Sequence, residues 1–144
     1  MITQEQYFQA KPHTEAHAAS ADDLLKRRNA LRGEWCEETS KECPVCPNTG
    51  TEISGSKRGQ GDGGFRLMTA GTGRPNSSHK EARGVDDYDP QNEFDTWLDG
   101  FEDGIGGNTK LETYGLYREH PDDTKGWCHL TTRRPGSGHR TFKP

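Results

Sequence analysis

Two histidines and one aspartate carry the chemistry that this sequence most strongly suggests. His79 and Asp86 are separated by six residues in S-S-H-K-E-A-R-G-V-D-D-Y-D-P, residues 77–90, and His129 follows in G-W-C-H-L near the C-terminus. Two imidazoles and one carboxylate, with a fourth position left to water, are typical of a catalytic zinc site, whereas structural sites are usually closed by four ligands, mostly thiolates. We therefore predict that these three residues bind Zn²⁺, which would polarise a carbonyl and lower the pKa of its bound water.

The sequence around these ligands resembles a known family. The first run resembles the S-x-H-x-x-G-x-A-x-D signature of zinc peptidases of the D-alanyl-D-alanine carboxypeptidase class, a superfamily shared with lysostaphin-type enzymes and the hedgehog signalling domain. The matching positions, with the small pair inverted, are Ser77, His79, Ala82, Gly84 and Asp86. Downstream, Trp127-Cys128-His129 resembles the W-x-H of that family, and upstream Gly64-Phe65-Arg66 resembles its S-G-aromatic-Arg segment. The three segments occur in the order that the family has.

This resemblance implies a zinc peptidase that hydrolyses a bond involving a D-amino acid in the peptidoglycan stem peptide, as a carboxypeptidase or an endopeptidase. Together with the short chain, it implies an endolysin-like lysis or wall-remodelling protein of bacteriophage origin. It implies one zinc peptidase-like domain over residues 1–144. The alternative is a non-catalytic zinc-binding module, or a phage structural protein with the same fold.

The general base of the family is missing from its usual place. In the D-Ala-D-Ala branch a glutamate stands three residues before the last histidine, and Gly126 occupies that position here. In the branch that uses H-x-H, a histidine stands two residues before the last histidine, and Trp127 occupies that position here. Neither base is therefore present at its family position. The segment Y-R-E-H-P-D-D offers substitutes, and we predict Glu119, which closes the preceding strand, as the catalytic carboxylate. His120 is the second choice, and Asp122 and Asp123 are further alternatives.

Three more residues are candidates for the substrate cleft. The resemblance implies that Arg66 holds a substrate carboxylate or stabilises the developing oxyanion, and a structural ion pair is the equally open alternative. It also implies that Ser77 orients the His79 loop or contacts substrate. Trp127 is a predicted substrate-binding residue beside the last ligand.

Helices and strands should place these residues on a common surface. We predict a polar lead-in over 1–19 with a short helical turn near Gln4–Phe8, then a helix capped by Ser20 and ending near 33–35. A long loop should span 36–63. Asp89 and Pro90 should open a second helix with an apolar stripe, and Gly106-Gly107 should end that helix. That stripe is Phe94, Trp97, Leu98, Phe101 and Ile105.

Strands are predicted at 64–69, 83–88, 112–117 and 126–132, with an edge strand in the basic tail. Alternation within a strand places Asp86 on one face of 83–88 and Val85 on the other, and separates His129 from Cys128 and Leu130 in the same way. The expected fold is α+β, a small antiparallel sheet with helices packed on one face and the zinc site on the other. The resemblance implies a hedgehog or D-Ala-D-Ala peptidase-like fold.

Composition limits the other possibilities. Only 27% of the 144 residues are hydrophobic, so the core should be modest and a bound metal would add stability. The pI near 5.9 gives no reason to expect a nucleic-acid partner. The N-terminus lacks a signal peptide and no segment predicts membrane insertion, so we expect synthesis in the cytoplasm and action on the cell wall after release.

The four cysteines divide into a cluster and a single residue. Cys36, Cys43 and Cys46 lie within eleven residues and end in C-x-x-C. They are interpreted as reduced thiols in a loop, with a second structural zinc or a disulfide as alternatives. Cys128 should be a small buried hydrophobic residue.

Overall fold

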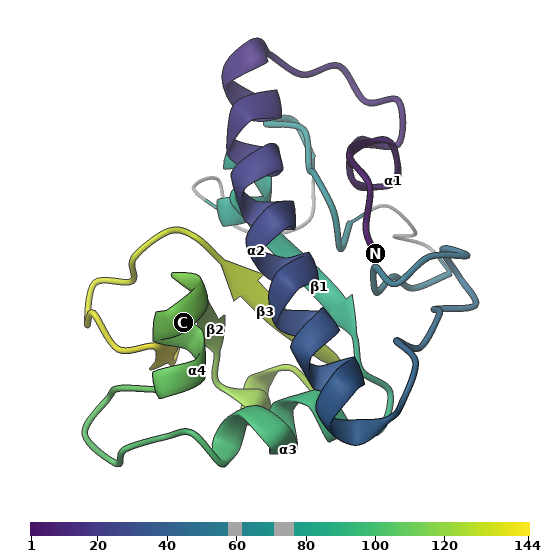
Figure 1. Cartoon of the computed structure of the whole chain (residues 1–144). Helices are drawn as coiled ribbons and strands as arrows, with labels where there is room; N and C mark the ends of the chain where they lie inside the picture. The colour runs from purple at the N-terminus through teal and green to yellow at the C-terminus, as the bar shows by residue number, and fades with distance from the viewer. Residues whose placement is uncertain (58–61, 71–76) are drawn as a thin grey trace.

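The structure is a computed structural model that describes residues 1–57, 62–70 and 77–144 (Figure 1). Its fold is α+β, with one long helix, several short helices and a small sheet. In chain order the elements are α1 (Gln4–Phe8), α2 (Glu15–Thr39), the 3-10 turn η1 (Ser78–Glu81), β1 (Gly84–Tyr88), α3 (Glu93–Asp99), α4 (Thr109–Tyr114), β2 (Tyr117–Glu119), the 3-10 turn η2 (Pro121–Asp123), β3 (Trp127–Thr131) and β4 (Thr141–Phe142).

The sheet has the strand order β1-β3-β2-β4 and is mixed, which corrects the prediction of an antiparallel sheet. Strand β3 pairs antiparallel with both β1 and β2, whereas β4 pairs parallel with β2. The reason is topological. Both sides of β3 are already paired, so the chain that reverses after β3 reaches the free side of β2, and a strand antiparallel to β3 is parallel to β2.

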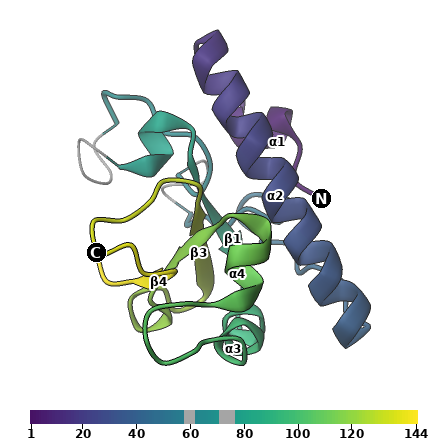
Figure 2. The same cartoon turned by 60° about the vertical axis from the view of Figure 1, so that its left-hand side comes forward.

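Helix α2 crosses one face of the sheet, and α3 and α4 lie beside the C-terminal half of α2 (Figures 1 and 2). The side chains of Val85, Cys128 and Leu130 point toward these helices and belong to the same buried cluster as Leu24 and Leu31 of α2. The alternation predicted for β1 and β3 is therefore confirmed. Residues of the opposite parity face away from the helices.

Helix α2 begins six residues before the predicted start, with its N-cap at Thr14 and not at Ser20. The Thr14 hydroxyl accepts a hydrogen bond from the His17 amide at 3.0 Å, while His17 accepts one from the Thr14 amide at 3.2 Å. This capping box precedes an alanine-rich stretch with high helix propensity, so the helix continues through Ser20. Asp22 therefore lies in the second turn, where it pairs with Lys26 at 2.9 Å.

Two predictions for residues 89–117 were wrong. The predicted helix over 89–107 is limited to α3, because it stops at Gly100, and Ile105 is 85% exposed in the following loop. The first half of the predicted strand over 112–117 belongs to helix α4, and only Tyr117 lies in a strand, β2. The Asn108 side chain caps that helix through the Leu111 amide at 3.0 Å, and Gly115 ends it with a φ of 66°.

The predicted strand over 64–69 is not a strand. Its backbone donates to two separate segments, from Phe65 to the Tyr7 carbonyl at 3.0 Å and from Arg66 to the His79 carbonyl at 3.2 Å. The predicted 36–63 loop starts later, since α2 continues to Thr39, and it contains one bridge from Ile53 to Asp87. Residues 58–61 of that loop lie outside the described residues.

Buried charge forms part of the core between helix and sheet. The Arg28 guanidinium donates to both oxygens of Asp87, at 2.6 and 3.1 Å, and to Glu52 at 2.8 Å. Arg32 lies 3.4 Å from the same Asp87 and stacks over the rings of Trp35 and Phe94. Arg28, Arg32 and Asp87 are all buried, so ion pairs fill space that a larger apolar core would otherwise occupy.

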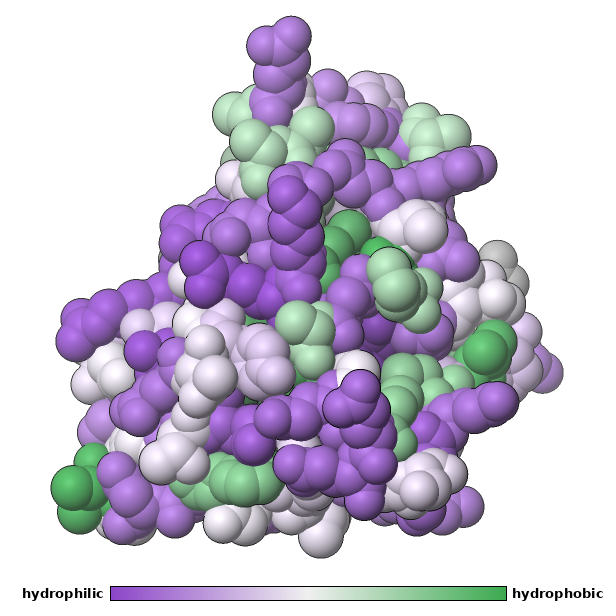
Figure 3. Space-filling model, viewed as in Figure 1, coloured by the Kyte–Doolittle hydropathy of each residue, from purple (hydrophilic) through white to green (hydrophobic). Residues whose placement is uncertain are grey.

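The surface agrees with the composition. The face drawn in Figure 3 is mostly hydrophilic, with hydrophobic residues in small separate groups. None of the helices in the described ranges combines the length and the apolar character that a membrane span requires.

Candidate metal centre

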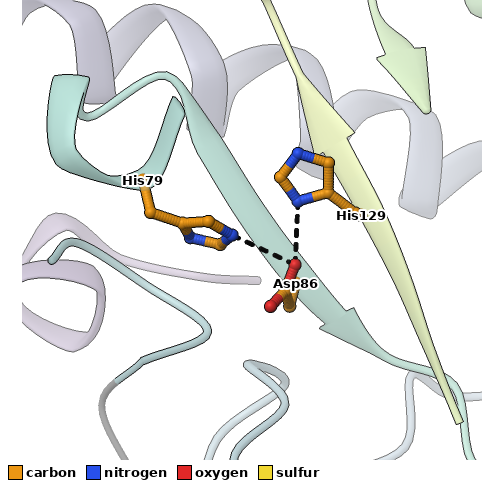
Figure 4. A group of neighbouring side chains, drawn as sticks. All are labelled: His79, Asp86 and His129. Carbon is orange, nitrogen blue, oxygen red and sulfur yellow. Dashed lines mark hydrogen bonds and ion pairs between the residues drawn. The ribbon is translucent and has the colours of Figure 1, made fainter. Parts of the chain in front are cut away.

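Three elements bring the predicted ligands together. His79 is in η1, Asp86 is in the middle of β1 and His129 is in the middle of β3. Asp86 and His129 are direct partners in the antiparallel register, so their side chains rise from neighbouring positions of the same face. Figure 4 shows the two imidazoles converging on the Asp86 carboxylate.

The ligand atoms have the spacing of a metal site. Asp86 Oδ1 lies 2.8 Å from His129 Nδ1 and 3.2 Å from His79 Nε2, and one ligand atom from each residue lies within 4.8 Å of the others. Ligand atoms at about 2.0–2.1 Å from a tetrahedral zinc would be about 3.3 Å apart. Small side-chain adjustments would therefore admit an ion. The cluster could hold a metal ion, and its mixed nitrogen and oxygen donors suit a first-row divalent metal.

The outer nitrogen of each imidazole also has a partner. His79 Nδ1 lies 2.9 Å from the Gly64 carbonyl oxygen, which can only accept, so this nitrogen carries the proton and leaves the Nε2 lone pair for a metal. His129 Nε2 lies 3.3 Å from the Ser78 hydroxyl. Such second contacts fix the ring orientation and the tautomer of metal-bound histidines.

The cluster is shielded from solvent, with 4% of His79 and 8% of His129 exposed. Burial alone would raise the pKa of Asp86, but the charge of His79 and the hydrogen bonds from both rings hold that pKa well below its ordinary value. The Arg66 guanidinium lies 3.7 Å from Asp86 Oδ2. Asp86 is therefore a carboxylate at neutral pH, as a metal ligand must be.

Gly84 is needed for the two ligand elements to meet. A Cβ at this position would lie 2.3 Å from Ser78 Oγ and 3.0 Å from His129 Cε1. A larger residue would require the Ser78 and His129 side chains to shift. Glycine at the position two residues before Asp86 therefore suits the close packing of η1 against β3, which gives the inverted small pair of the sequence a physical basis.

All the predicted site residues line one pocket of about 420 Å³. The lining includes the three candidate ligands together with Arg66, Ser77, Glu119 and Trp127. The other eight lining residues were not predicted from the sequence: Ser78, Thr131, Arg133, Pro135, Gly136, Phe142, Lys143 and Pro144. The doublet S-S before His79 could have indicated Ser78, whereas the tail residues became part of the pocket only because β4 pairs with β2.

Of the four residues considered as substitutes for the missing family glutamate, Glu119 lines this pocket. Strand β2 pairs with β3 as Tyr117 with Thr131 and Arg118 with Leu130, so one further step brings Glu119 beside His129. His120, Asp122 and Asp123 are not among the lining residues. Gly126 has a φ of 95°, a conformation that a glutamate at the family position would adopt only with strain.

Two hydrogen bonds to backbone carbonyls, one from its side chain and one from its main-chain amide, hold Arg66 beside the cluster. Its Nε donates to the Asp62 carbonyl at 2.6 Å, and its main-chain amide donates to the His79 carbonyl. Ser77 caps η1, where its hydroxyl accepts from the His79 amide at 3.3 Å. The predicted roles of Ser77, to orient the His79 loop or to contact substrate, stay predictions.

Comparison of the chain with protein-family models, curated proteins and solved structures gave no match. The geometry of the pocket therefore carries the functional argument.

Proposed function

We propose that this protein is a zinc-dependent peptidase that hydrolyses a stem-peptide bond of peptidoglycan, at a bond involving a D-amino acid. The observation that carries the proposal is the convergence of His79, Asp86 and His129 in a pocket that also contains Glu119 and Arg66. Hydrolysis of an amide needs an electrophilic activator, a proton acceptor and a group that holds the substrate. The substrate class rests on the resemblance of the ligand segments to D-alanyl-D-alanine carboxypeptidases.

The metal would be held by His79 Nε2, Asp86 Oδ1 and His129 Nδ1. Zinc bound there would supply a Lewis acid for the scissile carbonyl and lower the pKa of water. The Gly64 carbonyl and Ser78 hydroxyl would keep the two rings oriented for binding.

The remaining work falls to the side chains of the pocket. Glu119 would accept the proton of the attacking water and donate it to the leaving amine. Arg66 would pair with a substrate carboxylate or with the oxyanion that develops at the carbonyl. Trp127 and Phe142 offer aromatic surface in the lining of the pocket.

The place of action is part of the same proposal. A stem peptide lies outside the cytoplasmic membrane, so the protein would act on the cell wall after release through a membrane pore, as a phage lysis protein would.

Digestion of purified peptidoglycan tests the proposal. The zinc-loaded chain should release free D-alanine if it is a carboxypeptidase, or new amino termini if it is an endopeptidase, and mass spectrometry of the products distinguishes the two. A chelator and the His129→Ala substitution should each stop the reaction. Zinc bound in stoichiometric amount without any hydrolysis would instead favour the non-catalytic zinc-binding module.

A second candidate rests on one specific contact. Ser78 Oγ, His129 and Asp86 are connected at 3.3 and 2.8 Å in the order of a Ser-His-Asp triad. The metal site is the stronger proposal because Asp86 Oδ1 contacts both imidazoles, whereas a triad carboxylate serves a single histidine. Labelling of Ser78 by a fluorophosphonate, together with hydrolysis that survives a chelator, would establish the triad instead.

A further inference from the structure

Two cysteine thiols meet at the end of the long helix. Cys36 lies in the last turn of α2 and Cys43 follows the reversal at Ser40, whose φ is 56°. Their sulfur atoms are 3.4 Å apart, and both residues are partly buried. The contact joins the helix to the segment that leaves it.

The other cysteines are separate from this pair. The Cys46 thiol is buried and donates to the Gly55 carbonyl at 3.4 Å, and Cys128 is in the core beneath the sheet. Among the described residues, the group that could hold a metal ion is the His79 cluster and not the cysteines. The predicted alternative of a second zinc at Cys36, Cys43 and Cys46 therefore has no support in the structure.

The segment after Cys43 runs along the outer edge of β1. The Tyr88 amide donates to the Glu52 carbonyl and the Ser54 amide donates to the Asp86 carbonyl, each at 2.8 Å. The strand that carries a metal ligand is therefore covered by a segment whose start lies beside Cys36.

We propose that Cys36 and Cys43 are a disulfide site, oxidised when the chain meets a small-molecule or protein disulfide. A disulfide needs its sulfurs at about 2.05 Å, so they must approach by roughly 1.4 Å, which side-chain rotation can supply. This inference does not depend on the proposed peptidase activity.

The oxidation is a two-step thiol–disulfide exchange. With oxidised glutathione, one cysteine thiolate attacks a glutathione sulfur, forms a mixed disulfide and releases one glutathione thiolate. The second cysteine then attacks the protein sulfur, forms the Cys36–Cys43 bond and releases the second glutathione. The two thiol protons pass to the two glutathione thiolates, so two electrons leave the protein and reduce one glutathione disulfide.

The reaction should be slow near neutral pH and should stabilise the fold. Burial raises the pKa of Cys43, so its thiol stays protonated and the attacking thiolate is scarce. The bond would close the short loop 36–43 and join α2 to the segment along β1. Loop-closure entropy for a loop of this size corresponds to a rise in Tm of about 5–10 °C.

Peptide mapping of the oxidised full-length chain tests the proposal. Trypsin cleaves after Arg32, Lys41 and Lys57, so it separates Cys36 from the peptide that contains Cys43 and Cys46. The chain is oxidised with glutathione disulfide in the presence of EDTA, alkylated and digested. We expect the two peptides to be linked in the parent chain and in Cys46→Ser, but not in Cys43→Ser.

Melting of the same samples completes the test. Under reducing conditions the Cys43→Ser and Cys46→Ser variants should melt close to the parent, which shows that they fold. After oxidation the rise in Tm should appear in the parent and in Cys46→Ser alone. A peptide link that persists in Cys43→Ser, or a parent chain that acquires only glutathione adducts, overturns the assignment. His129→Ala should oxidise as the parent does, so failure here is distinguishable from failure of the metal site.

Discussion

Replacement of His129 by alanine should abolish the thermal stabilisation that Zn²⁺ gives the parent chain. His129 Nδ1 is one of the three candidate ligand atoms, 2.8 Å from Asp86 Oδ1. Without it two protein ligands remain, fewer than the three that catalytic zinc sites use. His79→Ala should have the same effect, because His79 Nε2 occupies an equivalent place in the cluster.

The expected shift follows from linkage. A ligand that binds only the native state stabilises it by about 2.7 kcal/mol at one hundred times its Kd. An unfolding entropy of about 2.1 cal/mol/K per residue amounts to about 0.3 kcal/mol/K for the 144 residues of this chain. Zinc at that concentration should therefore raise the Tm of the parent by about 9 °C.

Scanning calorimetry of EDTA-treated protein, with and without added zinc, measures this rise. Each variant is compared with itself, so the effect of the substitution on the metal-free fold cancels. His139→Ala is the matched control, since His139 is an exposed histidine outside the cluster. A parent that shows no shift, or a His129→Ala variant that shifts as far as the parent, would refute the metal-site assignment.

Three further predictions concern catalysis and stability. Glu119→Gln should keep the zinc-dependent rise in Tm but lose about two to four orders of magnitude in kcat on peptidoglycan; normal turnover would place the proton acceptor elsewhere. Arg66→Ala should stay folded and lose about one to three orders of magnitude in kcat/KM, whereas unfolding would make Arg66 a structural residue. Asp87→Asn should lower the free energy of unfolding in urea by about 3–5 kcal/mol, because Arg28 and Arg32 would stay buried without their carboxylate. A loss below about 1 kcal/mol would show that the pair contributes no more than a surface ion pair.

The sequence was sufficient to predict the cluster because its strands alternate cleanly. Val85 on one strand and Cys128 and Leu130 on the other are apolar residues of one parity, which places Asp86 and His129 on the opposite face. The roles of Glu119 and Arg66 stay predictions, although both residues line the pocket. Ser78 was missed because the family signature directs attention to Ser77, and one position within a 3-10 turn decides which hydroxyl faces His129.

The errors in the fold arose where local signals compete. Thr14 and Ser20 are both acceptable N-caps, and the reciprocal contact with His17 selects the earlier one. Asn108 and Gly115 are the cap and the terminator of α4, but the residues between them also fit a short strand. Residues 64–69 form no ladder, because the backbone partners of Phe65 and Arg66 come from α1 and η1, which no periodicity in the segment encodes.

The buried arginines explain how a chain with so few hydrophobic residues positions its site. Asp86 and Asp87 are neighbours on β1, and a strand sends them to opposite faces. Arg28 and Arg32 of α2 hold Asp87 beneath the sheet through contacts of 2.6 and 3.4 Å. A slip of one residue in β1 would bury Asp86 against these arginines and turn Asp87 toward the histidines. Each face of the strand would still present one aspartate, but Val85 would leave the core. The 0% exposure of Val85 and the fork of Arg28 on Asp87 together select the observed register. The ion pairs under the sheet therefore specify which of two adjacent carboxylates faces His79 and His129.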